Sequence, residues 1–521
     1  MKRDVKSLQT NEFDLVVIGA GVHGACVARD ASLRGLKVAL IDKADICGAT
    51  SHNSLKTIHG GIRYLQHLNI ARTWASIKEQ RYWLLTAPQS VKPLPFLMPT
   101  YGHGMRGPLA MLAGILLYAL LGLGRNIGLK PESRIKFGRV VSAKECQKLA
   151  KGIASERLSG AAIWDDAQVE DADQTVLEIC DHAYQQGAVI ANYVAATDFL
   201  VKGSAVEGVQ VQDQLNGAAF NIKSRCVVNA SGPWIAEQLQ QSALAKPIKI
   251  DVPLVKSMNI VSKHKINDHA VSFYSQHASD SVVGKTKRLY FSVPWKDYTM
   301  FGTTHFSHTD KTVSAKANQS EIQSFIDEIN TGYPSLNLQL EDILYCYQGL
   351  TPADAAEDNN AAKRLHESKI IDHSEADSID NLVSIVSIKW TTARLIAEKC
   401  TNVVVKKLGN SQKCATRHTP IPSLGCERNL AHLSDQQLKQ ACITHIEKTM
   451  CMNMTDFLLR RTDDFITNQL NEHQLQRILT TFSNYYNWSN ERQHQEIESL
   501  LNTFLLPETH TTLKNIHNTI S

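Results

Sequence analysis

The sequence predicts an α/β fold: a nucleotide-binding βαβ unit opens the chain, a strand-rich region follows, and helices end it. Residues 14–43 contain an apolar strand-like run, a glycine-rich turn, a segment with helical spacing and a second apolar run. Strand-like segments recur between residues 250 and 380, and an amphipathic helical pattern begins after Ser434, a residue type favoured at helix N-caps. At 521 residues and 43% hydrophobic, the chain can form two or three domains with a large buried core.

Composition and charge exclude several classes of function. The net charge is +4, from 55 basic and 51 acidic residues, and no long basic run indicates a nucleic-acid partner. The 11 cysteines are odd in number and include no CxxC pair, which predicts reduced thiols rather than a disulfide framework. The N-terminal stretch lacks the apolar core of a signal peptide. We therefore expect the protein in the cytoplasm.

The first βαβ unit carries a G-x-G-x-x-G motif at Gly19, Gly21 and Gly24, which begins at the last residue of the apolar run DLVVIG. Gly19 permits a tight turn, Gly21 lets backbone N–H groups approach a pyrophosphate, and Gly24 lets the helix pack closely on the sheet. The second apolar run ends at Asp42, whose carboxylate can accept hydrogen bonds from a ribose diol, with Lys43 next to it. This pattern predicts a dinucleotide site, and the motif itself does not distinguish FAD from NAD.

The segment GATSHNSLKTIHGGIRYLQ, residues 48–66, resembles the flavin loop of FAD-dependent glycerol-3-phosphate dehydrogenases, a family of D-amino-acid-oxidase-like flavoproteins. The resemblance implies FAD as the cofactor. It implies hydroxyl and backbone donors for the pyrophosphate, and glycines where the chain passes the isoalloxazine. The matching positions are Thr50, Ser51, Lys56, His59, Gly60, Gly61, Arg63 and Tyr64.

The resemblance continues in patches along most of the chain. CVVNASGPWI (226–235) resembles a strand and turn that return to the nucleotide, and the strand before it resembles one that contacts adenine. SIKWTTAR (387–394) stands where the family has Gly-Gly-Lys-x-Thr-Thr-x-Arg beneath the flavin. The cofactor contacts implied by these patches are Val194, Ala230, Ser231, Gly232, Lys389, Trp390 and Thr391.

Two further patches lie outside the cofactor half. RLYFSVPW and MFGTTHF, between residues 288 and 306, match two strands of the family's substrate sheet. MNMTDFLLRRTDDF (452–465) resembles a signature of the family's C-terminal helical domain, which separates it from generic amino-acid oxidases.

The resemblance implies a discontinuous Rossmann-like FAD domain, a mixed-sheet substrate domain and a C-terminal helical domain. We expect the FAD domain to be drawn from residues 10–105, 150–250 and 381–410. The other expected units are an apolar helical insertion at 106–149, the substrate domain at 251–380 and the helical domain at 426–521.

Residues 108–124 carry no charge and lie between Arg106 and Arg125. A spanning helix needs about 20 apolar residues, so this glycine-interrupted stretch favours a buried or interfacial helix over a membrane span. Because bacterial and mitochondrial members of the family sit on the membrane surface to reach quinone, the resemblance favours peripheral association. The inner face of the cytoplasmic membrane is the expected surface, since arginines suit anionic headgroups.

The substrate half of the family pattern is eroded in this chain. The family surrounds the substrate phosphate with arginines, whose forked guanidinium suits phosphate oxygens. Thr351 in QGLTPA stands at one of these positions, and His366 in KRLHES at a second, close to Arg364. Asn259 replaces the family's candidate active-site histidine, and His305 replaces an aspartate. The chain therefore keeps the family's residues at the cofactor positions and departs from them at the substrate positions.

We expect an enzyme that oxidises a C–O or C–N bond of a small molecule by hydride transfer to flavin N5. The nearest named substrate is glycerol 3-phosphate, oxidised to dihydroxyacetone phosphate, with quinone or oxygen as the electron acceptor. His59 and His305 are candidate bases. Arg63 and Lys389 would stabilise reduced flavin or, with Tyr64, anchor an anionic substrate group.

Two other functions and the oligomeric state stay open at this point. The same scaffold could oxidise a cyclic amine or a secondary-metabolite intermediate, for which Asn259 in place of histidine is tolerable because an amine needs less base strength. A non-catalytic flavin-binding partner subunit is the second alternative. A homodimer is also open, and no metal site is expected.

Overall fold

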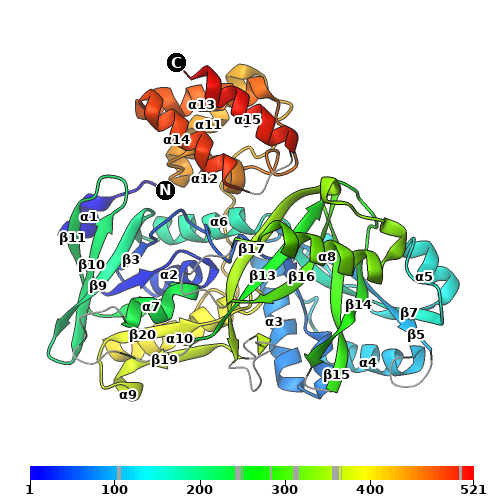
Figure 1. The fold of residues 1–521 in the computed structure, drawn as a ribbon. Coiled ribbons are helices and arrows are strands. Elements are labelled where there is room, and N and C mark those ends of the chain that lie inside the picture. Colours follow the sequence, from blue (N-terminus) through cyan, green and yellow to red (C-terminus); the bar gives the residue numbers. More distant parts are fainter. Residues whose placement is uncertain are drawn as a thin grey trace.

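The computed structural model describes the chain apart from residues 103–106, 241–243, 245–247, 249, 251, 282–283, 309–315, 355–362, 365–366, 504–506 and 521. The described residues form three β-sheets and a group of C-terminal helices (Figure 1). The predicted α/β fold class, with its helical C-terminal region, is confirmed.

The six-stranded sheet carries the glycine-rich turn. Its strand order is β19-β20-β12-β2-β3-β8, and its neighbours are parallel except for β19, which runs antiparallel to β20. The sheet is buried on both faces, which explains the continuous apolar runs in the sequence. The strands are β2 (Leu15–Ile18), β3 (Val38–Ile41), β8 (Val189–Ala191), β12 (Val227–Asn229), β19 (Lys369–Asp372) and β20 (Leu382–Val386).

Helices cover one face of this sheet and a small antiparallel sheet covers the other. Leu15 and Val17 of β2 belong to the core shared with the helices, and Val16 and Ile18 to the core shared with the small sheet. The helices are α2 (Val22–Leu33), α6 (Ala172–Gln185) and α10 (Ala393–Leu408), with α2 between the other two. The small sheet consists of β1 (Glu12–Phe13), β11 (Ala219–Ser224), β10 (Ala205–Asp213) and β9 (Val194–Lys202).

A ten-stranded sheet forms the other half of the body, on the right of Figure 1. Its order is β18-β17-β13-β16-β15-β14-β5-β7-β4, and β6 also pairs with β7. The strands are β4 (Thr57–Ile58), β5 (Val91–Tyr101), β6 (Arg139–Ser142), β7 (Leu158–Val169), β13 (Leu254–Ser262), β14 (Ala270–Ser281), β15 (Gly284–Trp295), β16 (Tyr298–Ser307), β17 (Ile343–Asp354) and β18 (Lys363–Arg364).

Strand pairing differs from the expected domain boundaries at four strands. The expected FAD segments 10–105 and 150–250 include β4, β5 and β7, which instead join the ten-stranded sheet through the β5–β14 pairing. Conversely, β19 falls within the expected substrate segment but closes the edge of the six-stranded sheet. The reason is that alternation within a strand shows which of its faces is buried and does not identify its partner.

Shorter elements connect these layers. They are α1 (Val5–Thr10), η1 (Ile62–His67), α3 (Ile70–Thr86), η2 (Pro131–Ser133), α5 (Ala143–Leu149), η3 (Gly232–Trp234), α7 (Ile235–Gln240), α8 (Gln319–Gly332), η4 (Pro334–Leu336), η5 (Leu340–Asp342) and α9 (His373–Ala376).

The uncharged stretch 108–124 forms helix α4 (Pro108–Leu121), which lies at the surface beside η1. Ile115 and Tyr118 are buried, whereas leucines on its other faces are exposed, so the expectation of a buried helix is wrong and the interfacial one remains. The guanidinium of Arg125 lies over the ring of Tyr118, 4.4 Å from its centroid, and Arg106 lies outside the described residues. Within the described part of the chain, no helix is long and apolar enough to cross a membrane.

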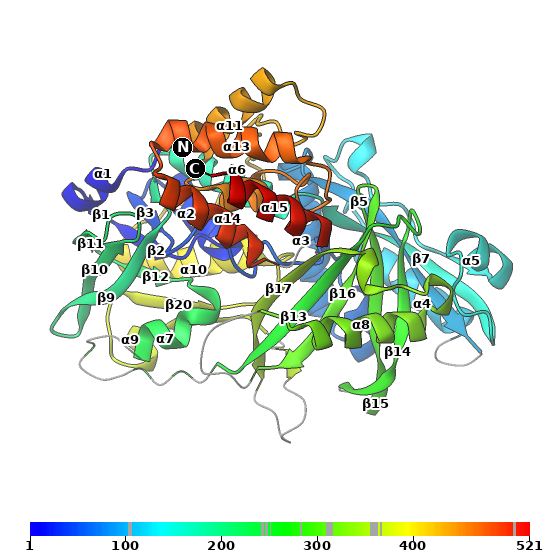
Figure 2. The same cartoon turned by 45° about the horizontal axis from the view of Figure 1, so that its top comes forward.

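The C-terminal helices pack together above the nucleotide-binding half, next to α6 (Figures 1 and 2). The predicted N-cap at Ser434 is confirmed, since its side chain accepts a hydrogen bond from the Gln437 backbone. The helices are α11 (Asp435–Thr449), α12 (Met454–Asp456), the π-helical turn η6 (Phe457–Arg461), α13 (Glu472–Tyr486), α14 (Asn490–Leu501) and α15 (Pro507–Thr519).

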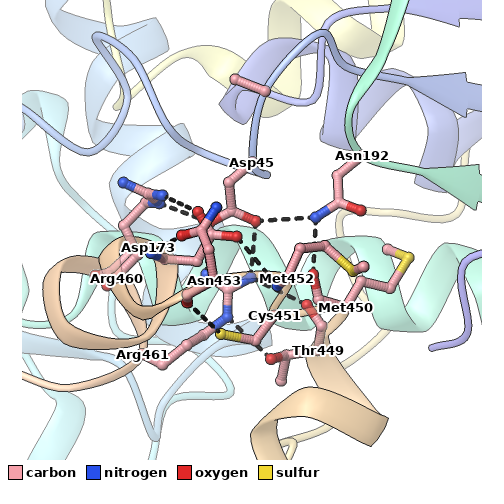
Figure 3. A network of polar contacts seen from close by, with 12 residues as sticks. Asp45, Asp173, Asn192, Thr449, Met450, Cys451, Met452, Asn453, Arg460 and Arg461 are labelled. Atoms are coloured by element: carbon pink, nitrogen blue, oxygen red, sulfur yellow. Dashed lines mark hydrogen bonds and ion pairs between the residues drawn. The ribbon is translucent and has the colours of Figure 1, made fainter. Parts of the chain in front are cut away.

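A buried ionic network joins these helices to the loop after β3 (Figure 3). Asp45 accepts hydrogen bonds from Arg460 Nε at 2.6 Å and from Arg461 Nη1 and Nη2 at 2.8 and 2.9 Å. Asn192, in the loop after β8, also donates to Asp45, at 3.2 Å. Burial alone would raise the pKa of Asp45, but the charges of Arg461 and Arg460 outweigh it and hold that pKa below its usual range. The network ties the C-terminal helices to the nucleotide-binding sheet.

Candidate functional site

A cavity of about 920 Å³ runs from the glycine-rich turn of the six-stranded sheet to the polar face of the ten-stranded sheet. It brings together most of the site residues predicted from the sequence. Those lining it are Gly19, Gly21, Asp42, Lys43, Thr50, Ser51, Lys56, His59, Arg63, Ala230, Ser231, Gly232, Asn259, His305, Thr351, Lys389, Trp390 and Thr391.

The glycine-rich turn leaves room for a ligand at the N-terminus of α2. Gly19 has a φ of +99°, and a Cβ there would lie 2.6 Å from the Ala230 carbonyl oxygen. A Cβ on Gly24 would lie 1.8 Å from the Gly19 carbonyl oxygen, so Gly24 is buried against the turn and does not line the cavity. Gly21 is the N-cap of α2 and has no side-chain capping bond. The Val22 N–H donates to Ser51 Oγ at 3.0 Å, so a backbone donor and a hydroxyl meet at the positive end of α2, an arrangement that suits a pyrophosphate.

Asp42 lies at the tip of β3, where the sequence predicted a ribose-binding acid. Its carboxylate accepts hydrogen bonds from the backbone N–H groups of Ala20 at 2.7 Å and Ala44 at 2.9 Å. Burial raises its pKa to about 6, although both hydrogen bonds act in the opposite direction. The Val194 N–H donates to the Asp42 carbonyl at 2.7 Å, which brings β9 alongside this tip.

Lys43 directly follows Asp42 in the loop after β3. Its ammonium sits 3.8 Å from the centroid of the Trp234 ring, and both residues line the cavity. This cation–π contact joins the loop after β3 to the turn after β12.

The predicted flavin loop is hydrogen-bonded to two distant segments. Thr50 Oγ1 donates to the Leu350 carbonyl at 2.7 Å, and Trp390 Nε1 donates to the Ser51 carbonyl at 3.1 Å. The His59 N–H donates to Thr391 Oγ1 at 3.3 Å. These bonds hold the loop against β17 and against the segment before α10.

Gly60 and Gly61 were expected where the chain passes the isoalloxazine, but the structure shows other reasons for these glycines. A Cβ on Gly60 would lie 1.7 Å from the Tyr118 hydroxyl, so this glycine allows α4 to approach. Gly61 has a φ of +81°, a conformation that favours glycine, at the start of η1. Neither residue lines the cavity. Lys56 does line it, and its ammonium lies 4.9 Å from the Tyr347 ring centroid and 5.3 Å from that of Trp295.

Two basic residues and a tyrosine stand at the junction of the two halves. Lys389 Nζ donates to the Tyr64 hydroxyl at 2.6 Å, and the Tyr64 ring lies edge-on to His59 at 5.9 Å. Arg63, on η1, lines the cavity with its side chain accessible to solvent. Tyr64 contacts Lys389 but does not itself line the cavity.

Asn259 is buried on β13 and has partners for both ends of its amide. Its Oδ1 accepts from Thr303 Oγ1 at 2.7 Å, and its Nδ2 donates to the Asn53 carbonyl at 3.2 Å. Its amide therefore links the flavin loop to the ten-stranded sheet.

Thr351 and His305, both predicted from the sequence, meet through a residue that was not predicted. Ser257 Oγ lies 2.9 Å from His305 Nδ1 and 3.0 Å from Thr351 Oγ1. Arg288, at the start of the quoted RLYFSVPW strand, also lines the cavity and was missed. The available signal was a charged residue inside a strand of the substrate sheet. His366 lies outside the described residues.

Comparisons with known proteins agree with this geometry. The chain matches the family described as "FAD dependent oxidoreductase" over residues 14–398. It is 32% identical to a glycerol-3-phosphate dehydrogenase of Synechocystis over 432 residues, which is 81% of this chain and 75% of that relative.

Two solved structures show the same fold. The glycerol-3-phosphate dehydrogenase from Bacillus halodurans complexed with FAD matches with a TM-score of 0.72 and 20% identity, over 98% of this chain and 96% of that chain. The L-alpha-glycerophosphate oxidase from Mycoplasma pneumoniae with FAD bound matches with a TM-score of 0.56 and 18% identity, over 79% of this chain and 100% of that chain.

Proposed function

Because the chain belongs to the FAD-dependent glycerol-3-phosphate dehydrogenase family, we propose that it oxidises glycerol 3-phosphate to dihydroxyacetone phosphate. It is an FAD-dependent oxidoreductase, so the proposal concerns the substrate. The observation that carries it is the continuous cavity, with a dinucleotide cradle at one end and a basic, hydroxyl-lined wall at the other.

The residues present fit FAD. Gly19 and Gly21 line the cavity beside the α2 N-terminus, the turn there is too tightly packed for a Cβ at Gly19 or Gly24, and Asp42 offers a carboxylate for the ribose hydroxyls. Thr50, Ser51 and Thr391 lie along the same cavity wall. When bound, FAD supplies the flavin N5 that accepts a hydride from the substrate carbon.

The remaining chemistry falls to the side chains at the junction. We propose that the imidazole of His59 accepts the proton of the substrate hydroxyl. The His59 backbone is fixed by Thr391, and its ring contacts Tyr64. Lys389 and Arg63 place positive charge beside the reacting centre, where negative charge develops as the proton leaves. The Tyr64 hydroxyl orients the Lys389 ammonium.

The decisive experiment is an anaerobic titration of the FAD-loaded protein with glycerol 3-phosphate. We expect the oxidised flavin band to bleach, because hydride transfer reduces the flavin. Dithionite serves as the control that the flavin is reducible. Bleaching by dithionite but not by glycerol 3-phosphate would contradict the proposal. A panel of cyclic amines and non-phosphorylated alcohols would then separate a different substrate from a protein without turnover.

We also propose that the surface formed by α3 and α4 rests on a lipid membrane, where a quinone acceptor would be reached. Leu116 and Leu120 lie one turn apart on α4 and are 52% and 61% exposed. Trp74 on α3 is 51% exposed. Apolar side chains gathered on a surface helix suit insertion into the headgroup boundary.

Flotation with anionic phospholipid vesicles tests this surface. The wild-type protein is expected to float, and the double variant Leu116→Gln/Leu120→Gln is expected to lose most of the bound fraction. Leu215→Gln is the matched control, because Leu215 is 44% exposed in a turn remote in sequence, after β10. Equal flotation of the double variant and the control would contradict the proposed surface.

A further inference from the structure

Three neighbouring strands place polar side chains on one wall of the cavity. Ser257 on β13 faces His305 across the pairing with β16, and Val255, two residues earlier on β13, faces Thr351 across the pairing with β17. The Ser257 hydroxyl joins the other two side chains, at 2.9 Å from His305 Nδ1 and 3.0 Å from Thr351 Oγ1. All three line the cavity. The wall therefore offers hydroxyl and imidazole groups that reorient easily.

Arg288 adds a charge to this wall from β15, the strand next to β16. Its Nη1 lies 3.4 Å from the His305 carbonyl oxygen and 3.4 Å from the Tyr290 hydroxyl, which are long contacts with neutral partners. Among the described residues, no carboxylate forms an ion pair with it within 4 Å. Its guanidinium is half-buried and lines the cavity.

Three more deeply buried arginines, unlike Arg288, are paired with carboxylates. Arg394, Arg460 and Arg461 each have a carboxylate partner, with the shortest N···O distances at 2.6, 2.5 and 2.8 Å. Taking a guanidinium out of water costs free energy that a counter-charge offsets. A half-buried arginine at a cavity, held by neutral acceptors alone, can take an anion from a ligand.

We infer that Arg288, Ser257, His305 and Thr351 form the subsite that holds the phosphate group of the substrate. A phosphate monoester accepts hydrogen bonds and carries negative charge, which matches a wall of one guanidinium and rotatable donors. A cationic amine would face Arg288 and be disfavoured. The inference rests on the proposed function and deepens it, since it assigns the specificity for a phosphorylated alcohol to Arg288 and Ser257, which the sequence pattern did not indicate, together with His305 and Thr351.

Steady-state kinetics with FAD-loaded Arg288→Gln test the subsite, with glycerol 3-phosphate and glycerol as the substrate pair. For glycerol 3-phosphate we expect KM to rise about 10- to 100-fold, the loss typical of a charge-assisted hydrogen bond, with kcat changed by less than about threefold. The KM for glycerol should not change. Arg288→Lys should recover part of the affinity because it keeps the charge. Arg139→Gln is the control, since Arg139 is an exposed arginine paired with Glu145 on the surface.

A binding measurement without turnover separates the phosphate subsite from the proposed oxidation of glycerol 3-phosphate. Inorganic phosphate should perturb the flavin absorbance of the wild-type protein and act only at higher concentration in Arg288→Gln. If glycerol 3-phosphate bleaches the flavin of the wild-type protein and its KM is unchanged in Arg288→Gln, the subsite is overturned and the proposed function stands. If glycerol 3-phosphate does not bleach the flavin, but inorganic phosphate perturbs its absorbance in a way that depends on Arg288, then glycerol 3-phosphate is overturned as the substrate and the subsite is supported. A stronger perturbation by acetate than by phosphate would overturn the phosphate assignment in favour of a carboxylate.

Discussion

Asp45→Asn is expected to lower the free energy of unfolding by about 3–5 kcal/mol, because it removes the carboxylate that pairs with the buried Arg461 and one of the two that pair with Arg460. The Arg461 side chain is fully buried and that of Arg460 is 10% exposed, so water cannot replace the lost charge. Asparagine keeps the shape of the side chain, which restricts the change to charge. Urea unfolding followed by tryptophan fluorescence measures the effect, and tryptic cleavage between α10 and α11 reports undocking of the C-terminal helices.

The control for this substitution is Glu145→Gln. Glu145 pairs with Arg139 on the surface, where their side chains are 41% and 56% exposed, and an exposed pair contributes about 0–1 kcal/mol. If both variants unfolded at the same urea concentration, the ionic network around Asp45 would not be what holds the C-terminal helices to the nucleotide-binding half.

Gly24→Ala is expected to yield protein with little bound FAD. The added methyl group would lie 1.8 Å from the Gly19 carbonyl oxygen, so either α2 or the glycine-rich turn must move. Such overpacking costs about 1–3 kcal/mol, and here it falls on the turn that cradles the pyrophosphate. The ratio of flavin to protein absorbance in the purified variant measures the loss.

Gly114→Ala provides the comparison. Gly114 lies inside α4, and a Cβ there would have no heavy atom within 4 Å. Alanine favours the helix over glycine by about 1 kcal/mol, so this variant should retain full flavin content and slightly higher stability. A Gly24→Ala protein with a full complement of FAD would show that the turn tolerates the displacement.

The nucleotide end of the site could be predicted because its residues are close together in the sequence. Gly19, Gly24 and Asp42 lie within one βαβ unit, and apolar runs and glycine spacing describe such a unit well. The structure places all three around the same turn. The assignment of these residues to FAD contacts stays a prediction until ligand binding is measured.

What could not be predicted depends on contacts between distant segments. Gly60 fits against Tyr118, which comes from a helix 58 residues later, so its local sequence indicated only the flavin loop. Helix α4 is apolar on every face, and periodicity could not show which leucines would be exposed. Ser257 joins Thr351 to His305 only because three strands from separate segments are neighbours in one sheet.

The strand order of the six-stranded sheet has a consequence for biosynthesis. β2, at residues 15–18, pairs with β12 at 227–229, which in turn pairs with β20 at 382–386. The counter-charges of Asp45 are made later still, at residues 460 and 461. On the ribosome, the glycine turn is therefore synthesised long before the strands and charges that complete its surroundings. The residues that line the cavity extend as far as Thr391, so the complete FAD site requires that segment to have been synthesised and folded against β12.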